Sequence, residues 1–263
     1  MPDGETLPVV HDTGSGPALL LLHAFPLDAS QWDHQVAALS GDFRCLRPDM
    51  WGCGDSPPPV DALRVTLDGF AASVVAWLDA AGIGDVVLVG SSMGGYTAYA
   101  MLRQAPSRVR GLVLASARAS ADTEAQAADR RRMAGRALRE GAEFIVEPMA
   151  ARLLGPSARS EPHIADPVMG RIRRCRPEGI AACQIAMASR PDSGDLLASL
   201  TMPALVVAGE HDAVVSRDEA EALAAALPAG ELAVLSGVGH LANLEDPPAF
   251  TDVLSEFLRR VAG

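Results

Sequence analysis

Lysine is absent from this chain of 263 residues, whose 22 basic residues are all arginine. Pyridoxal Schiff bases, phosphate-binding loops, protein kinases and Ser-x-x-Lys acylases each need the lysine amine, so their chemistry is excluded. The acidic residues number 33, which gives a net charge of -11 at pH 7. Such a charge repels phosphate backbones and anionic membrane surfaces, and we therefore expect no nucleic-acid partner and no membrane partner.

Cysteine is scarce, and long hydrophobic runs are missing. The cysteines form no C-x-x-C pair and have no histidine nearby at zinc-ligand spacing; they are Cys45, Cys53, Cys175 and Cys183. We interpret them as buried or incidental thiols in a reducing compartment, with a disulfide or a bound metal as alternatives. No apolar run approaches the ~18 residues of a membrane helix, and the amino terminus lacks a signal pattern, which predicts a cytoplasmic protein.

Short apolar segments alternate with helical patterns along most of the chain. The segments expected as strands are 18–24, 43–47, 85–90, 109–116, 204–210 and 231–236. The helices expected between them are 30–40, 66–81, 93–105, 216–227 and 247–261. This alternation predicts an α/β fold with a mostly parallel sheet, because apolar strands need helices on both faces. A strand pair around residues 5–12 would add an antiparallel edge and bring the sheet to eight strands.

Residues 117–195 break this rhythm. The segment is rich in arginine and helical in pattern, and prolines interrupt it at Pro148, Pro156, Pro162, Pro167 and Pro177. We interpret it as a helical cap inserted into one core domain, which would consist of residues 1–116 and 196–263.

A serine framed by glycines lies at the junction of one strand and the next helix. Residues 90–94 read Gly-Ser-Ser-Met-Gly and fit the pattern G-x-S-x-G with Ser92 at the centre. In such an elbow the turn exposes the central hydroxyl, and the glycines let strand and helix approach closely. The same residues would also suit a purely structural turn, so this pattern alone makes Ser92 only a candidate nucleophile.

Two further residues supply what a serine nucleophile needs. An alkyl hydroxyl requires an imidazole base, and the imidazole requires a carboxylate that fixes its tautomer and stabilises its cation. Asp212 follows the strand expected at 204–210, and His240 follows the strand expected at 231–236. The order Ser92, Asp212, His240 and the strand-end positions predict a catalytic triad.

These segments together resemble the α/β-hydrolase superfamily over nearly the whole chain. The resemblance is carried by LLLHAFPLDASQW, RPDMWGCGDS, VGSSMGGY, GEHDAVV and GVGHLANLEDPPAF. Within the superfamily, HAFPLDASQW, PEGIAACQIAMASRPDS and GHLANLEDPPAF are most similar to small capped bacterial carboxylesterases and 3-oxoadipate enol-lactonases. Ser91 stands where the family often has histidine, and residues 50–54 stand where it often has Arg-Gly-His-Gly. Both departures bear on the substrate.

The resemblance implies a function and a site. The chain would be a serine hydrolase of small esters or lactones without cofactor or metal, a monomer or homodimer that acts through an acyl-enzyme on Ser92. Its oxyanion hole would use the N–H groups of Phe25 and Met93, and Met93 opens a helix, where free N–H groups meet developing negative charge. Candidate pocket residues are Ser116, Met187 and Leu241, which directly follows the expected base.

Other interpretations stay open on the sequence. A haloperoxidase-like perhydrolase would use the same triad with peroxide in place of water, and a non-catalytic ligand receptor would keep the fold without the reaction. The arginines at 130–132 and 136 form either a solvated helix face or an entrance for anionic substrates. His23 either orients its loop or contacts the substrate.

Overall fold

The computed structural model describes residues 7–261. The strands are β1 Val10–Thr13, β2 Ala18–Leu22, β3 Arg44–Pro48, β4 Val86–Ser91, β5 Val109–Ala115, β6 Ala204–Gly209 and β7 Gly230–Leu235. The helices are α1 Asp33–Leu39, α2 Leu67–Ala80, α3 Met93–Gln104, α4 Glu124–Glu140, α5 Val146–Leu153, α6 Pro156–Arg159, α7 Pro162–Arg174, α8 Pro177–Ala188, α9 Gly194–Leu197, α10 Arg217–Ala226, α11 Ala242–Glu245 and α12 Pro247–Val261.

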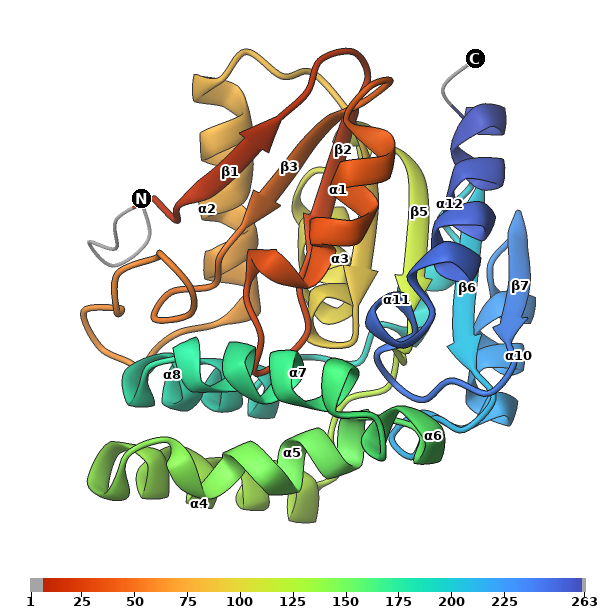
Figure 1. The fold of residues 1–263 in the computed structure, drawn as a ribbon. Coiled ribbons are helices and arrows are strands. Elements are labelled where there is room, and N and C mark those ends of the chain that lie inside the picture. The colour runs from red at the N-terminus through yellow and green to blue at the C-terminus, as the bar shows by residue number, and fades with distance from the viewer. Residues whose placement is uncertain (1–6, 262–263) are drawn as a thin grey trace.

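The described strands form one mostly parallel sheet in the order β1-β3-β2-β4-β5-β6-β7 (Figure 1). Only β1 runs antiparallel to its neighbour, with Val10 opposite Pro48 of β3. The predicted α/β sheet is confirmed, but the expected eight strands are seven in the described residues. Within the described residues 7–12 this edge holds one strand rather than a pair, since Pro8 has no N–H to give to a ladder. Residues 5 and 6 of the expected pair lie outside the described range.

Alternate strand side chains fill two apolar layers. On β4, Val87 and Val89 pack with α1 and α12, whereas Val86 and Leu88 pack with α2 and α3 on the opposite face. Because both faces are covered, these strands are continuous apolar runs in the sequence. Among the described helices, none combines the length and apolarity that crossing a membrane requires.

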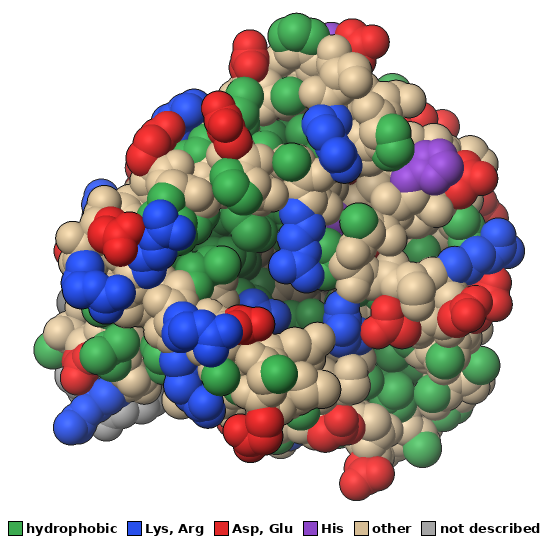
Figure 2. Space-filling view, turned by 90° about the horizontal axis from the view of Figure 1, so that it is seen from below, with side chains coloured by type: hydrophobic (Ala, Val, Ile, Leu, Met, Phe, Trp, Pro, Cys, Tyr) green, Lys and Arg blue, Asp and Glu red, His purple; other side chains and the backbone are tan. Residues whose placement is uncertain are grey.

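Between β5 and β6 the chain forms α4 to α9, which we call the α4–α9 layer (residues 124–197). α4, α5, α7 and α8 lie together beneath the edge of the sheet at which the parallel strands end (Figure 1). The last helix, α9, crosses the boundary expected at residue 195. Seen from the side of this layer, the surface is hollowed, with hydrophobic side chains in its depth and arginines around it (Figure 2).

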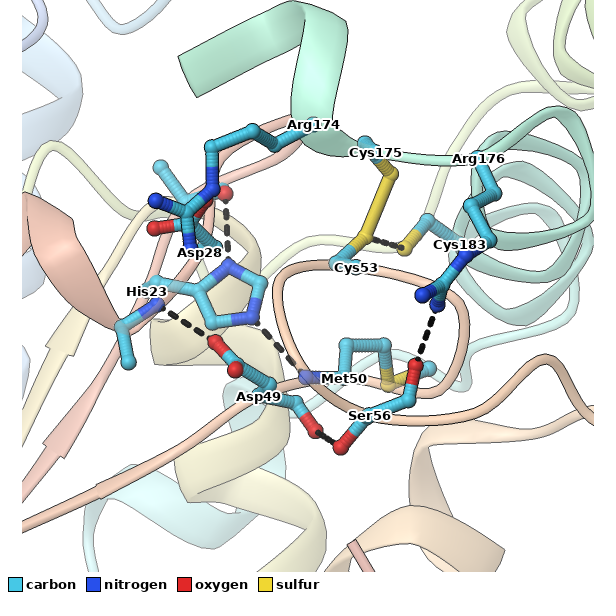
Figure 3. The surroundings of a disulfide bond; sticks show 12 residues. His23, Asp28, Asp49, Met50, Cys53, Ser56, Arg174, Cys175, Arg176 and Cys183 are labelled. Atoms are coloured by element: carbon cyan, nitrogen blue, oxygen red, sulfur yellow. Dashed lines mark hydrogen bonds and ion pairs between the residues drawn. A yellow bond between two sulfur atoms is a disulfide. The ribbon is translucent and has the colours of Figure 1, made fainter. Parts of the chain in front are cut away.

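A disulfide joins the layer to a loop of the sheet. Cys53 lies in the turn after β3 and Cys175 lies between α7 and α8, 122 positions away (Figure 3). The interpretation of all four cysteines as incidental thiols is therefore wrong for this pair, which only the α7–α8 turn brings together. Cys45 and Cys183 are free and buried. Burial raises the pKa of Cys183 to about 12, which keeps this thiol protonated and unreactive.

Polar and backbone contacts hold the same junction. The Arg176 N–H donates to the Gly52 carbonyl at 2.8 Å, and the Arg174 guanidinium pairs with the buried Asp28 carboxylate at 2.9 Å. A Cβ on Gly52 would lie 2.5 Å from the Gly179 Cα, so this position does not accept a side chain. The α7–α8 turn is thus fixed to the loops that follow β2 and β3.

Removing the disulfide should cost stability. The double substitution Cys53→Ser/Cys175→Ser is expected to lower the free energy of unfolding by about 2–5 kcal/mol, because the cross-link restricts a long loop of the unfolded chain. Both cysteines are replaced because the Cys183 Sγ lies 3.9 Å from the Cys53 Sγ and would offer a substitute partner. Urea unfolding measures the effect. Dithiothreitol should abolish the difference from wild type, and equal stabilities without reductant would contradict the prediction.

Candidate active site

Ser92 occupies a strained turn between β4 and α3. Its backbone dihedrals are φ 50° and ψ −110°, a region that residues other than glycine rarely adopt. The Ser92 N–H donates to the Ala115 carbonyl of β5 at 2.8 Å and so holds the turn against the sheet. The strain therefore lies at the residue that the G-x-S-x-G pattern singles out.

Two glycines let α3 begin close to the sheet. A Cβ on Gly94 would lie 2.1 Å from the Leu22 carbonyl oxygen, and a Cβ on Gly90 would lie 2.5 Å from the Gly94 carbonyl oxygen. Neither distance leaves space for a methyl group, so both glycines of the pattern are required by packing.

His240 and Asp212 meet at the ends of the loops that follow β7 and β6. The His240 Nδ1 lies 2.8 Å from Asp212 Oδ2 and 2.9 Å from Oδ1, and each side chain is 1% exposed. The other ring nitrogen, Nε2, is buried and makes no hydrogen bond to a described residue. His240 and Ser92 line the same cavity. The arrangement leaves one imidazole nitrogen for proton transfer and gives the other to the carboxylate.

The surroundings of Asp212 favour its ionised form. Burial by itself raises the pKa of this carboxyl. The hydrogen bond and charge of His240 and the N–H groups of Val215 and Val214 lower the pKa by more, so it lies below its ordinary value. The Val214 and Val215 N–H groups donate to Oδ1 at 2.7 and 3.0 Å. A carboxylate held in this way fixes the orientation of the imidazole.

The N–H groups of Phe25 and Met93 are available to a ligand. Met93 is the first residue of α3, so its N–H has no partner within the helix. Neither N–H donates to any residue that the structure describes, and Phe25 lines the cavity with Ser92. Two such donors are the usual means of stabilising an oxyanion.

Buried side chains fix the loop that carries Phe25. The Ala24 N–H donates to Gln31 Oε1 at 2.7 Å, and the Gln31 amide donates to Asn243 Oδ1 at 3.1 Å. His23 Nε2 accepts the Met50 N–H at 3.0 Å (Figure 3). His23 is not among the residues that line the cavity, which favours its loop-orienting interpretation.

The cavity has a volume of about 230 Å³, and it is walled by the sheet loops, α3 and the α4–α9 layer. Its apolar wall includes Tyr96, Met133, Met149, Leu153, Met187 and Val214. This volume and lining suit a small organic molecule.

Asp122, which lines the cavity, joins two arginines, of which only Arg130 also lines it. The Arg190 Nη1 lies 2.8 Å from Asp122 Oδ1, and the Arg130 Nε donates to Oδ2. Burial by itself raises the pKa of Asp122. The two guanidinium groups lower the pKa by more, so it lies below its ordinary value. The Arg190 guanidinium also stacks 4.1 Å from the ring centre of Tyr96 on α3. Asp122 is therefore engaged by arginines, and the carboxylate after β6 is the one that meets the histidine.

The arginines of α4 at 130–132 and 136 divide into two groups. Arg130 lines the cavity, where its Nη1 donates to Gln184 Oε1 at 3.1 Å and its Nη2 makes no hydrogen bond to a described residue. Arg132 and Arg136 instead pair with acidic residues three and four positions away on the helix surface, and Arg131 is exposed. The solvated-face interpretation fits these three, whereas Arg130 belongs to the cavity.

Of the expected pocket residues, Met187 lines the cavity and the other two do not. Leu241 is 0% exposed within the core, and Ser116 is 3% exposed at the end of β5, where its N–H donates to the Val207 carbonyl. The reason is that neighbouring residues of a loop point apart, so Leu241 does not share the wall with the histidine before it. Gln184 and Arg118 line the cavity and were not expected from the sequence, which carries no local signal for them.

His11, Asp49 and Asp55 are the one group of described side chains with ligand atoms close enough to hold a metal ion, within 4.8 Å of one another. The Asp49 carboxylate already accepts the N–H groups of Ala29 at 2.6 Å and Asp55 at 2.9 Å. We therefore assign this group to the turn after β3.

Comparison with known proteins places this geometry in a family context. A family model described as "alpha/beta hydrolase fold" matches residues 17–247. The 3-oxoadipate enol-lactonase 1 of Acinetobacter baylyi is 26% identical over 267 residues, covering 98% of this chain and 95% of that protein. The putative 2-succinyl-6-hydroxy-2,4-cyclohexadiene-1-carboxylate synthase of Bacillus subtilis is 27% identical, covering 93% of this chain and 91% of that protein.

A solved structure is more similar still. The thermophilic esterase of Thermogutta terrifontis, with malate bound, is 38% identical and superposes with a TM-score of 0.92. The match covers 97% of this chain and 94% of the esterase chain. The likeness thus extends over the sheet, its loops and the α4–α9 layer together.

The lowered pKa of Asp212 predicts how stability responds to acid. The ionised carboxylate stabilises the folded protein above the ordinary pKa of ~3.9, and this contribution is lost as the pH falls through the lower folded value. Asp212→Asn should reduce the free energy of unfolding by about 1–3 kcal/mol at neutral pH, because hydrogen bonds to a charged group are lost. Urea unfolding of variant and wild type between neutral pH and pH ~3 should show the gap narrowing below pH ~4. A gap that widens in acid would contradict the assignment.

Proposed function

This chain belongs to the α/β-hydrolase family, and from that premise we propose that it is a serine hydrolase that cleaves small carboxylic esters or lactones through an acyl-enzyme on Ser92. The esterase of T. terrifontis and the enol-lactonase of A. baylyi support this substrate class. The site would bind a small uncharged or anionic substrate, since the cavity suits a small organic molecule.

One observation carries the proposal. His240 holds Asp212 with Nδ1 and keeps an unengaged Nε2 at the cavity that Ser92 also lines. A structural turn would need neither the buried carboxylate nor the histidine, and a ligand receptor would gain nothing from orienting the imidazole. The combination is what activation of a hydroxyl requires.

In the first half of the reaction, His240 Nε2 accepts the Ser92 proton as the hydroxyl oxygen attacks the ester carbonyl carbon. The carbonyl oxygen becomes an oxyanion, which the N–H groups of Phe25 and Met93 stabilise. Asp212 stabilises the imidazolium. The imidazolium then returns its proton to the leaving alkoxide, the ester C–O bond breaks, and the alcohol departs.

In the second half, water repeats these steps on the acyl-enzyme. His240 takes a proton from the water, whose oxygen attacks the acyl carbon. The second oxyanion collapses, the bond to the serine oxygen breaks, and Ser92 recovers its proton from the imidazolium. The carboxylic acid leaves. With a lactone the alcohol and the acid are two ends of one product.

We further propose that residues 117–195 act as a cap that selects the substrate. Met133, Met149 and Met187 of the α4–α9 layer line the cavity opposite the sheet loops. Methionine side chains adapt to irregular apolar shapes, which suits a wall that accepts short acyl groups.

A fluorophosphonate probe tests the proposed nucleophile. Folded wild-type protein should be labelled at Ser92, as located by peptide mass spectrometry, and Ser92→Ala should not be labelled. Asp212→Asn should lower kcat for p-nitrophenyl acetate by ~10³–10⁴, because His240 loses the partner that fixes its tautomer. The matched control is Asp218→Asn, which removes an exposed carboxylate at the start of α10 and should keep the wild-type kcat. Wild-type protein that resists the probe, or equal kcat for the two variants, would refute the proposal.

The charge of the cavity predicts a response to salt. Its charged lining residues are Arg118, Arg130, Arg152, Asp122 and Asp129, more positive than negative in a chain whose net charge is -11. For an ester with a carboxylate on its acyl chain, kcat/KM should fall about two- to fivefold between ~0.02 and ~0.5 M salt, while a neutral ester of equal length should not respond. Arg152→Gln should weaken the response and Arg131→Gln, outside the cavity, should not. Equal salt responses of the two esters would show that the arginines do not attract the substrate.

A further inference from the structure

Glu245 is a partly buried carboxylate that takes no part in the reaction above. It ends α11, the short helix after His240, and accepts three backbone N–H groups. Gly155 and Gly239 each donate to its Oε2 at 2.9 Å, and Leu241 donates to its Oε1 at 3.2 Å. Gly239 and Leu241 are the chain neighbours of His240. One carboxylate therefore holds the backbone on both sides of the proposed base.

Gly155, the remaining donor to Glu245, belongs to the α4–α9 layer. Gly155 lies between α5 and α6, and a Cβ there would come within 2.8 Å of the Gly239 nitrogen. The His240 N–H in turn donates to the Leu153 carbonyl at 3.0 Å. The loop of the base and the layer are thus in direct backbone contact, and the carboxylate bridges them.

The opposite side of the same loop rests on the sheet. A Cβ on Gly209, at the end of β6, would lie 2.0 Å from the Gly239 carbonyl oxygen. The His211 N–H donates to the Val238 carbonyl at 2.8 Å. The loop is therefore clamped between the strand that leads to Asp212 and the α4–α9 layer.

Stability alone does not account for the carboxylate. Glu245 forms no ion pair within the part of the chain that the structure describes. Burial raises its pKa above the ordinary value against the effect of the three N–H groups, and the charge of Asp212 raises it further. A partly buried carboxylate without a counter-ion adds little stability beyond what its hydrogen bonds return, so its effect on the site lies in the backbone that those bonds hold.

We propose that Glu245 is a positioning residue for His240. Its carboxylate fixes the position of the loop after β7, and thus of His240, relative to Asp212, and it couples that position to the position of the α4–α9 layer. The inference rests on the proposed role of His240 as base. A shift of about 1 Å in a reacting group can cost ~10²-fold in rate. Because Glu245 does not line the cavity, its loss should affect proton transfer more than substrate binding.

Substitution of the carboxylate tests the first part. Glu245→Ala should lower kcat for p-nitrophenyl acetate and the rate of fluorophosphonate labelling by about 10- to 100-fold, with KM within about threefold of wild type. Glu245→Gln should stay within about fivefold of wild type, because one amide oxygen can accept both glycine N–H groups, as Oε2 does. Asp246→Ala is the matched control: this neighbouring carboxylate caps α12 through the Ala249 N–H at 3.0 Å, and its loss should leave kcat unchanged.

Glycine variants test the coupling without replacing the carboxylate. Gly155 has φ −64°, which alanine adopts freely, so Gly155→Ala acts through its Cβ, which would lie 2.8 Å from the Gly239 nitrogen and 2.9 Å from Glu245 Oε2. It should lower kcat by about tenfold or more. Gly170→Ala in α7 of the same layer is the control, since a Cβ there meets nothing within 4 Å, and it should keep the wild-type kcat.

The outcomes separate this inference from the proposed function. Wild-type protein that fails to react with the probe defeats the proposed function itself. A reactive wild type with an equally reactive, folded Glu245→Ala overturns the role of Glu245 alone, as does a change confined to KM or a Gln variant as slow as the Ala variant. If Glu245→Ala does not fold, Glu245→Gln and Gly155→Ala decide, and wild-type kcat in Gly155→Ala overturns the coupling.

Discussion

Backbone packed against backbone at the carboxyl edge of the sheet is the constraint on which the site depends. Gly94 lies against the Leu22 carbonyl, and Gly209 lies against the Gly239 carbonyl, with no space for a methyl group at either contact. The first contact places the turn of Ser92 and the second places the loop of the histidine. Peptide groups have few conformations, so positions set by them do not drift with side-chain rotamers. The site is thereby held more tightly than side-chain packing alone would hold it.

Two of the contacts between the α4–α9 layer and this edge differ in character, one at the α7–α8 turn and one at Gly155. At the α7–α8 turn, the Cys53–Cys175 bond and the Arg174–Asp28 pair fix the layer to the loops after β3 and β2. None of these four residues lines the cavity. At Gly155 the contact consists of hydrogen bonds and involves the loop of His240, which does line the cavity. Covalent and ionic contacts resist separation more than hydrogen bonds do. The contact at the α7–α8 turn is therefore the harder of the two to separate.

Features encoded by neighbouring residues could be predicted from the sequence, whereas contacts between residues far apart in the chain could not. The strand expected at 204–210 is Ala204–Gly209, and the helix expected at 66–81 is Leu67–Ala80, because burial on both faces and helical periodicity are written into adjacent residues. The positions of Asp212 and His240 after successive strands followed from chain order. The disulfide did not, because its partners are 122 positions apart.

The cavity wall was the least predictable part, for a physical reason visible in α8. Its residues from Gly179 to Gln184 are buried without interruption. A helix that is covered all round has no apolar stripe to say which side faces a cavity. Met187 lines the cavity, and so does Gln184, one turn earlier, which was not expected there. The role of Glu245 is hidden for a related reason, since a carboxylate in a polar-looking segment gives no sign that it will accept backbone N–H groups.

The absence of lysine bears on the cavity as well as on the chemistry it excludes. Arg130 gives its Nε to Asp122 and its Nη1 to Gln184, and its Nη2 is still uncommitted toward described residues. A guanidinium can be fixed by two partners and present a third donor in a defined direction, whereas an ammonium on a flexible stem would rotate. Asp122 also binds Arg190, so one carboxylate aligns two arginines and leaves the group with excess positive charge. The cavity of this acidic chain thus combines an apolar wall with an arginine, Arg130, that two partners hold and whose Nη2 makes no hydrogen bond to a described residue.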